Sequence, residues 1–119
     1  MAPSVLIIDD DPTFREMAGH LLIAAGLEVV GEADGAEAGM SVAEATRPDA
    51  ILLDVMLPDG NGATAAADFT ALPWRPRVLL TSSSPDAVGL NEIGAGGVVG
   101  FVFKQELPEA PLARLLEGS

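Results

Sequence analysis

The sequence predicts an α/β domain, a doubly wound five-stranded parallel sheet with helices on both faces. Short aliphatic runs alternate with longer segments whose apolar residues recur at helical spacing, and this alternation is typical of such sheets with right-handed crossovers. Most of the aliphatic runs are bounded by acidic or turn residues, as expected of strands buried on both faces. The chain has 119 residues, enough for one core, so residues 1–119 are expected to form a single domain.

The first strand, the first helix and the second strand follow one another near the N-terminus. Val5–Ile8 is a short aliphatic run followed by acids and predicts a buried strand. Asp11 and Pro12 then supply an N-cap and a proline at the first helical position. The helix is expected to end at Gly26, and its apolar residues are Phe14, Met17, Ala18, Leu21, Leu22 and Ala25. Residues 27–33 alternate loosely and predict a strand at the sheet edge.

Two further helices and three strands are predicted in the middle of the chain. Residues 34–37 resemble a capping box, and the helix that follows should end before Pro48. Its inward side is expected to carry Ala36, Met40 and Ala43. A third helix is expected at residues 63–72, with Ala66, Phe69 and Leu72 facing inward. The remaining strands are expected at residues 50–53, 77–81 and 99–103.

The last two helices have weaker signals. Four glycines lie between Pro85 and Val98, so a fourth helix there should be short or frayed. Pro108 and Pro111 allow a final helix only from about Glu109 onward, ending at Gly118.

Composition narrows the possible functions. The chain has no cysteine, which excludes disulfides and thiolate metal sites. Its formal net charge is −12, from 18 acids and 6 bases, so direct binding to nucleic acid is not expected. The sequence contains neither a recognisable signal peptide nor an apolar run of membrane-spanning length, so we expect no membrane association and a cytoplasmic location.

Polar residues collect where four of the predicted strands end. Asp9 and Asp10 follow the first strand, and Asp54 follows the third. Thr81 and Ser82 end the fourth strand, and Lys104, the only lysine of the chain, follows the fifth. In parallel α/β sheets ligands bind beyond the carboxyl ends of the strands, so these side chains predict one site.

Three converging carboxylates would repel one another, and a divalent cation removes that penalty. Oxygen ligands without histidine or cysteine favour Mg²⁺, with Mn²⁺ as a possible substitute. Lys104 could neutralise a phosphate oxygen and a hydroxyl could bind another. A carboxylate left free to attack would then accept a phosphoryl group.

The whole chain resembles the receiver domains of two-component response regulators. The segments that carry the resemblance are VLIIDDDP, ILLDVMLPDGNG, VLLTSSS and GFVFK, in this order and spacing. The resemblance implies a flavodoxin-like fold with strand order 2-1-3-4-5. It also implies a signalling domain that catalyses its own phosphorylation and slow dephosphorylation. The implied phosphoryl donor is a histidine kinase, a phosphotransfer protein or an acyl phosphate. The implied partner downstream is an effector protein or domain.

The resemblance also assigns roles to residues. Asp54 would be the phosphoryl acceptor, and Asp10 and Asp54 would bind Mg²⁺ directly, with Asp9 acting largely through water. The backbone carbonyl of Met56 would be a further ligand, and Lys104 would contact the phosphoryl group. Phe101, three residues before Lys104, matches the aromatic residue of the family's switch. The implied switch surface lies near the fourth and fifth strands.

Two features stay open. Counting along the fourth strand from Val78 favours Ser82 as the switch hydroxyl, with Thr81 as the alternative. The family often has proline after the strand-five lysine, with a cis peptide between them. Here Gln105 follows, and a non-proline cis bond costs ~3 kcal/mol, so a cis bond is less expected.

Three alternative functions differ in their requirements. An aspartyl phosphatase of the haloacid-dehalogenase type needs a second aspartate two residues after the nucleophile, where this chain has Met56. A flavodoxin-type electron carrier needs a phosphate-binding loop after the first strand, and none follows Ile8. A degenerate receiver that only binds partners would not need the full set of aspartates, hydroxyl and lysine. His20, the only histidine, is expected to be an exposed helix residue rather than a phosphate relay.

Overall fold

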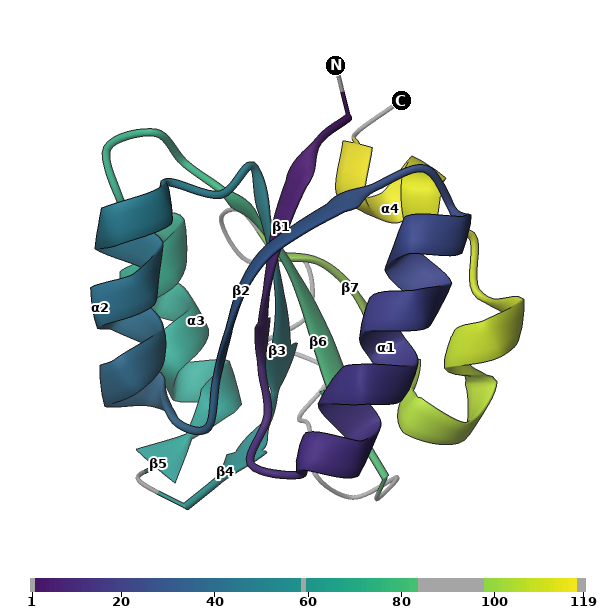
Figure 1. Ribbon diagram of the computed structural model, residues 1–119. Coiled ribbons are helices and arrows are strands. Elements are labelled where there is room, and N and C mark those ends of the chain that lie inside the picture. The colour runs from purple at the N-terminus through teal and green to yellow at the C-terminus, as the bar shows by residue number, and fades with distance from the viewer. Residues whose placement is uncertain (1, 59, 84–97, 118–119) are drawn as a thin grey trace.

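The computed structural model describes residues 2–58, 60–83 and 98–117. Its main sheet has five parallel strands in the order β2-β1-β3-β6-β7, so the predicted fold class and strand order are confirmed. The strands are β1 (Ser4–Ile8), β2 (Glu28–Ala33), β3 (Ala50–Asp54), β6 (Arg77–Ser82) and β7 (Val98–Phe103). All five point the same way, and their carboxyl ends meet at the lower edge of the sheet in Figure 1.

Helices cover both faces of this sheet. Helices α2 (Ala36–Thr46) and α3 (Gly62–Thr70) lie on one face, and α1 (Pro12–Ala24) and α4 (Leu112–Glu117) on the other (Figure 1). Alternate strand residues point to opposite faces, so the core has two parts. One contains Leu53 and Leu80 with the α2 and α3 residues, and the other contains Leu52 and Leu79 with the α1 and α4 residues.

The predicted start of α1 and the predicted inward-facing residues of α2 and α3 agree with the structure. In α1, Asp11 is the N-cap, its side chain accepts a hydrogen bond from the Thr13 backbone N–H, and Pro12 is the first helical residue, as predicted. The predicted inward sides of α2 and α3 are also confirmed. Ala43, Ala66 and Phe69 are buried, and Ala36, Met40 and Leu72 pack partly buried against the same core.

The predicted capping box of α2 is wrong. The N-cap is Gly35, one residue later than expected, and it makes no side-chain cap hydrogen bond because glycine has no side chain. The Ile8 side chain explains why small residues are needed here. A Cβ built on Gly39 would lie 2.5 Å from Ile8 Cδ1, so α2 packs on the sheet through its own glycine.

The end of the chain also differs from expectation. Instead of one helix from about Glu109, a 3-10 helix spans Lys104–Glu109 with Pro108 inside it, and α4 begins only at Leu112. A 3-10 turn tolerates Pro108 because the segment is too short to need a full ladder of α-helical bonds. Leu107 is completely buried and fixes this turn on the α1 side of the sheet.

Two short strands were not predicted. β4 (Met56–Leu57) and β5 (Gly60–Asn61) form an antiparallel pair directly after β3, at the edge where the parallel strands end. The predicted fourth helix lies outside the described residues. Within the part of the chain that is described, no helix is long and apolar enough to cross a membrane.

Candidate functional site

The polar residues singled out in the sequence meet at the carboxyl edge of the sheet. Asp9 and Asp10 follow β1, Asp54 is the last residue of β3, and Lys104 comes directly after β7. β1 and β3 are neighbours, and β3 and β6 are neighbours, so their ends are brought together by direct strand pairing. The predicted convergence is therefore what the fold produces.

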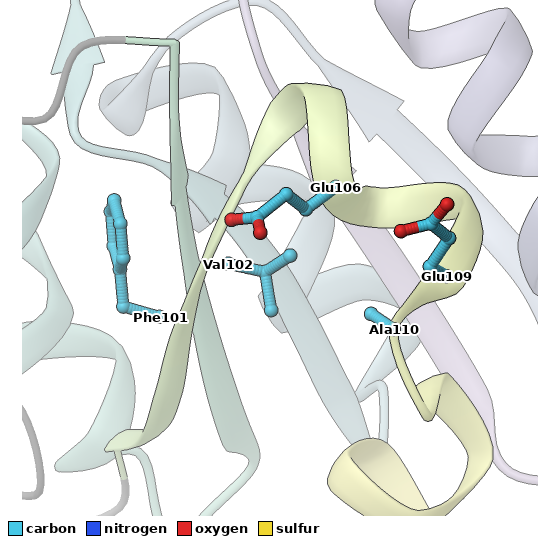
Figure 2. A pocket seen from close by; sticks show the side chains of 5 residues that line it. All are labelled: Phe101, Val102, Glu106, Glu109 and Ala110. Atoms are coloured by element: carbon cyan, nitrogen blue, oxygen red, sulfur yellow. The ribbon is translucent and has the colours of Figure 1, made fainter.

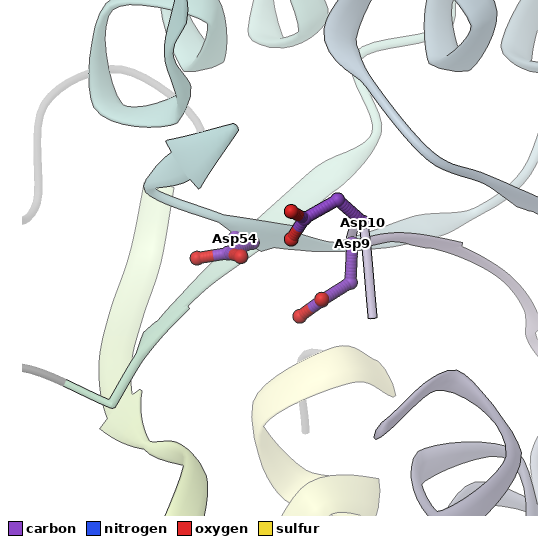
Figure 3. Close-up of side chains that lie close together, drawn as sticks. All are labelled: Asp9, Asp10 and Asp54. Atoms are coloured by element: carbon purple, nitrogen blue, oxygen red, sulfur yellow. The ribbon is translucent and has the colours of Figure 1, made fainter. Parts of the chain in front are cut away.

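Three carboxylates form the centre of the site. Asp9 and Asp54 are 1% and 3% exposed, whereas Asp10 is exposed. One carboxylate oxygen from each lies within 4.8 Å of the others, and Figure 3 shows the three side chains turned toward a common space. Buried carboxylates are rare unless paired, so this arrangement needs a compensating cation.

Lys104 supplies part of that compensation. Its Nζ lies 2.7 Å from Asp9 Oδ2 and 3.3 Å from Asp54 Oδ2, and its side chain is 17% exposed. The same ammonium lies 4.6 Å from the centroid of the Phe14 ring. One positive charge thus faces two buried carboxylates and one aromatic face.

Backbone groups hold the two buried carboxylates in place. The Asp11 N–H donates to Asp9 Oδ1 at 2.9 Å, and the Met56 N–H donates to Asp54 Oδ1 at 2.9 Å. Arg15 donates from Nη1 to the Asp9 backbone carbonyl at 2.5 Å. In both carboxylates the other oxygen, Oδ2, faces Lys104, so each carboxylate has a fixed orientation.

Burial and charge alter the titration of two groups. Burial raises the pKa of the Asp9 carboxyl above its usual value, the nearby Asp54 charge adds to this, and the hydrogen bonds from Lys104 and Asp11 partly oppose it. For Lys104, burial works against the charged form. The Asp9 hydrogen bond and the charges of Asp54 and Asp9 outweigh that effect and raise the pKa of the ammonium.

The carboxylate group fits a hard divalent cation. All three ligating side chains offer oxygen, and one of them is exposed, so a cation could bind while keeping several waters. A single ammonium cannot neutralise three carboxylates, and burial together with the nearby Asp54 charge keeps the pKa of the Asp9 carboxyl above its usual value. Asp9, Asp10 and Asp54 therefore suit Mg²⁺.

The two hydroxyl candidates lie on opposite faces of β6. Thr81 is the register partner of Asp54 in the β3–β6 pair. Alternation along the strand puts Thr81 on the face of Leu79 and Ser82 on the face of Leu80, which belong to the two different parts of the core. Thr81 therefore shares the face of Asp54, and its buried Oγ1 has no hydrogen-bond partner among the described residues.

Phe101 lies on the other face from the carboxylates. It packs partly buried in the core beneath α2 and α3, with its ring at 4.9 Å and 89° from the ring of Phe103. It also lines a pocket with Val102, Glu106, Glu109 and Ala110. Figure 2 shows its ring on one side of β7 and Glu106 on the other.

Two smaller expectations can be compared with the structure. The peptide between Lys104 and Gln105 is not cis. His20 is exposed and lies 4.0 Å from Glu16, away from the strand ends, as expected. Met56 is 62% exposed, and its backbone N–H contacts Asp54.

Sequence reasoning missed the residues that support the site. Phe14 appeared only as one apolar residue of the first helix, and Arg15 and the Asp11 backbone were not considered. The contact between Phe14 and Lys104 joins the first helix to the 3-10 helix that follows the last strand, and no local sequence pattern encodes it. Asp11 had a detectable signal, because an N-cap directly after a strand-end aspartate brings its N–H close to that carboxylate.

Comparison with known proteins identifies the class. The sequence model of the response regulator receiver domain matches residues 5–115. The chain therefore belongs to the response regulator receiver domain family.

Its relatives include regulators of transcription. The virulence-factor transcription regulator BvgA of Bordetella pertussis is 33% identical over 106 residues, which are 89% of this chain and 51% of that protein. The transcriptional regulatory protein NarL of Mycobacterium tuberculosis is 35% identical over 101 residues, 84% of this chain and 47% of that protein. The chain thus spans about half the length of these relatives.

Solved structures agree with this family. The signal receiver domain of the NarL response regulator from Mycobacterium tuberculosis has a TM-score of 0.79 at 33% identity, covering 99% of this chain and 98% of that one. A chemotaxis response regulator of Vibrio cholerae, at 24% identity, shares the fold with a TM-score of 0.78 over 98% of this chain and 100% of that one.

Proposed function

We propose that this chain is a working phospho-acceptor, in which Asp54 takes a phosphoryl group in a Mg²⁺-dependent reaction. The observation that carries the proposal is the placement of a buried Asp54 carboxylate beside Lys104, at 3.3 Å, and within 4.8 Å of the Asp9 and Asp10 oxygens. The donor would be the phosphohistidine of a histidine kinase or phosphotransfer protein, or a small acyl phosphate. Residues 1–119 would act as one receiver domain.

The transfer needs no proton on Asp54. A carboxylate oxygen of Asp54 attacks phosphorus, the bond from phosphorus to the donor nitrogen or oxygen breaks, and the bonding pair leaves with the imidazole or carboxylate of the donor. A bound Mg²⁺ would neutralise charge on the transferring phosphoryl oxygens. Asp10 and Asp54 would hold it directly, the Met56 carbonyl would be a further ligand, and Asp9 would act largely through water.

Lys104 and a hydroxyl would bind the remaining phosphoryl oxygens. Lys104 already faces Asp54 Oδ2, so it needs to move little to meet an oxygen bonded through that carboxylate. We assign the hydroxyl to Thr81 rather than to Ser82, which the count along the strand favours. The support is the pairing of Thr81 with Asp54 and its buried Oγ1, which has no partner among the residues described.

Phosphorylation would change the surface near β6 and β7, where a partner could detect it. Phe101 and Glu106 line one pocket, so a movement of β7 at Phe101 would alter that pocket. A downstream effector would bind there. The net charge of −12 opposes direct nucleic-acid contact by this domain. Transfer of a phosphoryl group to its own Asp54 fits a cytoplasmic signalling domain rather than an enzyme acting on metabolites.

The test is phosphorylation by acetyl phosphate and Mg²⁺, followed by intact mass. We expect a gain of one phosphoryl group, and we expect Lys104→Ala to slow it roughly a hundredfold because a charge-stabilising group is lost. Arg114→Ala, which removes an exposed positive charge from α4, should leave the rate unchanged. No mass gain under any condition would favour the degenerate receiver that acts only as a protein-interaction module.

A further inference from the structure

We infer that Phe14 is a positioning residue for the phosphoryl transfer, because its ring holds the Lys104 ammonium when the carboxylates are engaged elsewhere. This inference rests on the proposed function of Asp54 and Lys104. The ring centroid lies 4.6 Å from Lys104 Nζ, within the range of a cation–π contact. Phe14 is 6% exposed and Lys104 is 17% exposed at its side chain, so water screens this contact little.

The position of Phe14 is itself tightly determined. It lies in the first turn of α1, which begins at the Asp11 cap, and the backbone N–H of Asp11 also binds the Asp9 carboxylate. The ring packs in the same part of the core as Leu22 and Leu107, and Leu107 belongs to the 3-10 helix that begins at Lys104. One short segment, from Asp9 to Phe14, thus carries both an anionic partner of Lys104 and its aromatic partner.

The three partners of Lys104 respond differently to the reaction. A divalent cation held directly by Asp10 and Asp54, and through water by Asp9, would compete with Lys104 for the Asp54 and Asp9 carboxylates and would repel its ammonium. The Phe14 ring binds no metal and changes no charge. It is therefore the contact that keeps the ammonium beside Asp54 in the metal-loaded state, before a phosphoryl group arrives.

A fluorinated phenylalanine series at position 14 separates this role from packing. Successive fluorines withdraw the negative charge from the ring face while nearly preserving its shape. At saturating Mg²⁺ we expect the phosphorylation rate with acetyl phosphate to fall stepwise, by about threefold to thirtyfold for the fully fluorinated ring. The Mg²⁺ affinity should stay the same or tighten slightly. The same series at Phe69, buried in the opposite part of the core, should leave the rate unchanged.

Two results would overturn the inference. The first is a phosphorylation rate that does not change with fluorination at position 14, although Lys104→Ala lowers that rate. The second is a fluorination effect of the same size in the Lys104→Ala protein, where no ammonium remains for the ring to hold. If Lys104→Ala itself leaves the rate unchanged, the proposed function fails first.

An NMR measurement on the unmodified chain is independent of these variants. The ring should shift the Lys104 ε-proton resonances upfield both with and without Mg²⁺, and loss of that shift on adding Mg²⁺ contradicts the inference.

Discussion

Thr81 lies directly opposite Asp54 in the parallel pairing of β6 with β3, whereas Ser82 faces the other side of the sheet. We predict that Thr81→Val is neutral or stabilising in the unphosphorylated protein by up to about 1 kcal/mol, because the Thr81 hydroxyl is buried without a partner among the described residues. The same variant should weaken binding of a phosphoryl mimic such as beryllofluoride. Urea unfolding and beryllofluoride titration measure the two effects.

Ser82→Ala is the matched control for that prediction, because it deletes a hydroxyl one residue further along the same strand. We expect it to bind beryllofluoride as the parent does. If Ser82→Ala loses the response and Thr81→Val keeps it, the assignment of the hydroxyl reverts to Ser82.

Asp9 should make stability depend on pH. Its pKa is raised in the folded state, so the neutral carboxyl adds to the free energy of unfolding. That contribution is greatest below pH ~4 and is lost as the pH rises through the folded-state pKa. Charged Asp9 is therefore a net cost at neutral pH without metal. Asp9→Asn should raise the free energy of unfolding by on the order of 1 kcal/mol at pH 7.5 with a chelator present, and by less at pH 4.5. A variant that is less stable than the parent at pH 7.5 contradicts the proposed cost.

Mg²⁺ should stabilise the fold through Asp10. Mg²⁺ that binds only the folded state adds roughly 1.4 kcal/mol to the free energy of unfolding when its concentration is ten times the dissociation constant. The melting temperature of the parent should rise with Mg²⁺, and that of Asp10→Asn should not. Asp68→Asn removes an equally exposed charge from α3 and should keep the full Mg²⁺ response. An Asp10→Asn protein that still responds as the parent does would show that Asp10 is not a ligand.

Met56 should lengthen the life of the phosphorylated state. Its side chain is 62% exposed two residues after Asp54 and offers no strong hydrogen bond to orient an attacking water. We predict slow self-dephosphorylation in the parent and loss faster by on the order of tenfold in Met56→Asn. The decay can be followed by intact mass after the donor is removed. Ile23→Asn, at an equally exposed apolar residue on α1, should decay at the parental rate, and equal decay in all three proteins refutes the role of Met56.

Much of this architecture was predictable because local patterns determine it. The aliphatic runs located the five strands, and the carboxyl ends of parallel strands had to place Asp9, Asp54 and Lys104 at one edge. Choosing between Thr81 and Ser82 was not possible in the same way. A one-residue change of register moves every side chain to the opposite face, and the register is set by pairing with β3.

The remaining differences also have tertiary causes. Gly35 caps α2 in place of Asp34, and within that helix Gly39 packs directly against the Ile8 side chain of the sheet. Pro108 suggested a helix boundary, but burial of Leu107 stabilises a 3-10 turn across it. The Phe14–Lys104 contact depends on the packing of α1 against the turn after β7, which becomes visible only in three dimensions.

Phosphorylation at Asp54 itself is the central claim, and trapping the adduct tests it most directly. After reaction with acetyl phosphate and Mg²⁺, borohydride reduces an aspartyl phosphate to homoserine, and peptide mass spectrometry locates the reduced residue. We predict homoserine at position 54 alone, an adduct that hydroxylamine removes, and no trapped residue in Asp54→Asn. A hydroxylamine-stable phosphate on a serine of the 82–84 segment, or unchanged labelling of Asp54→Asn, would contradict it.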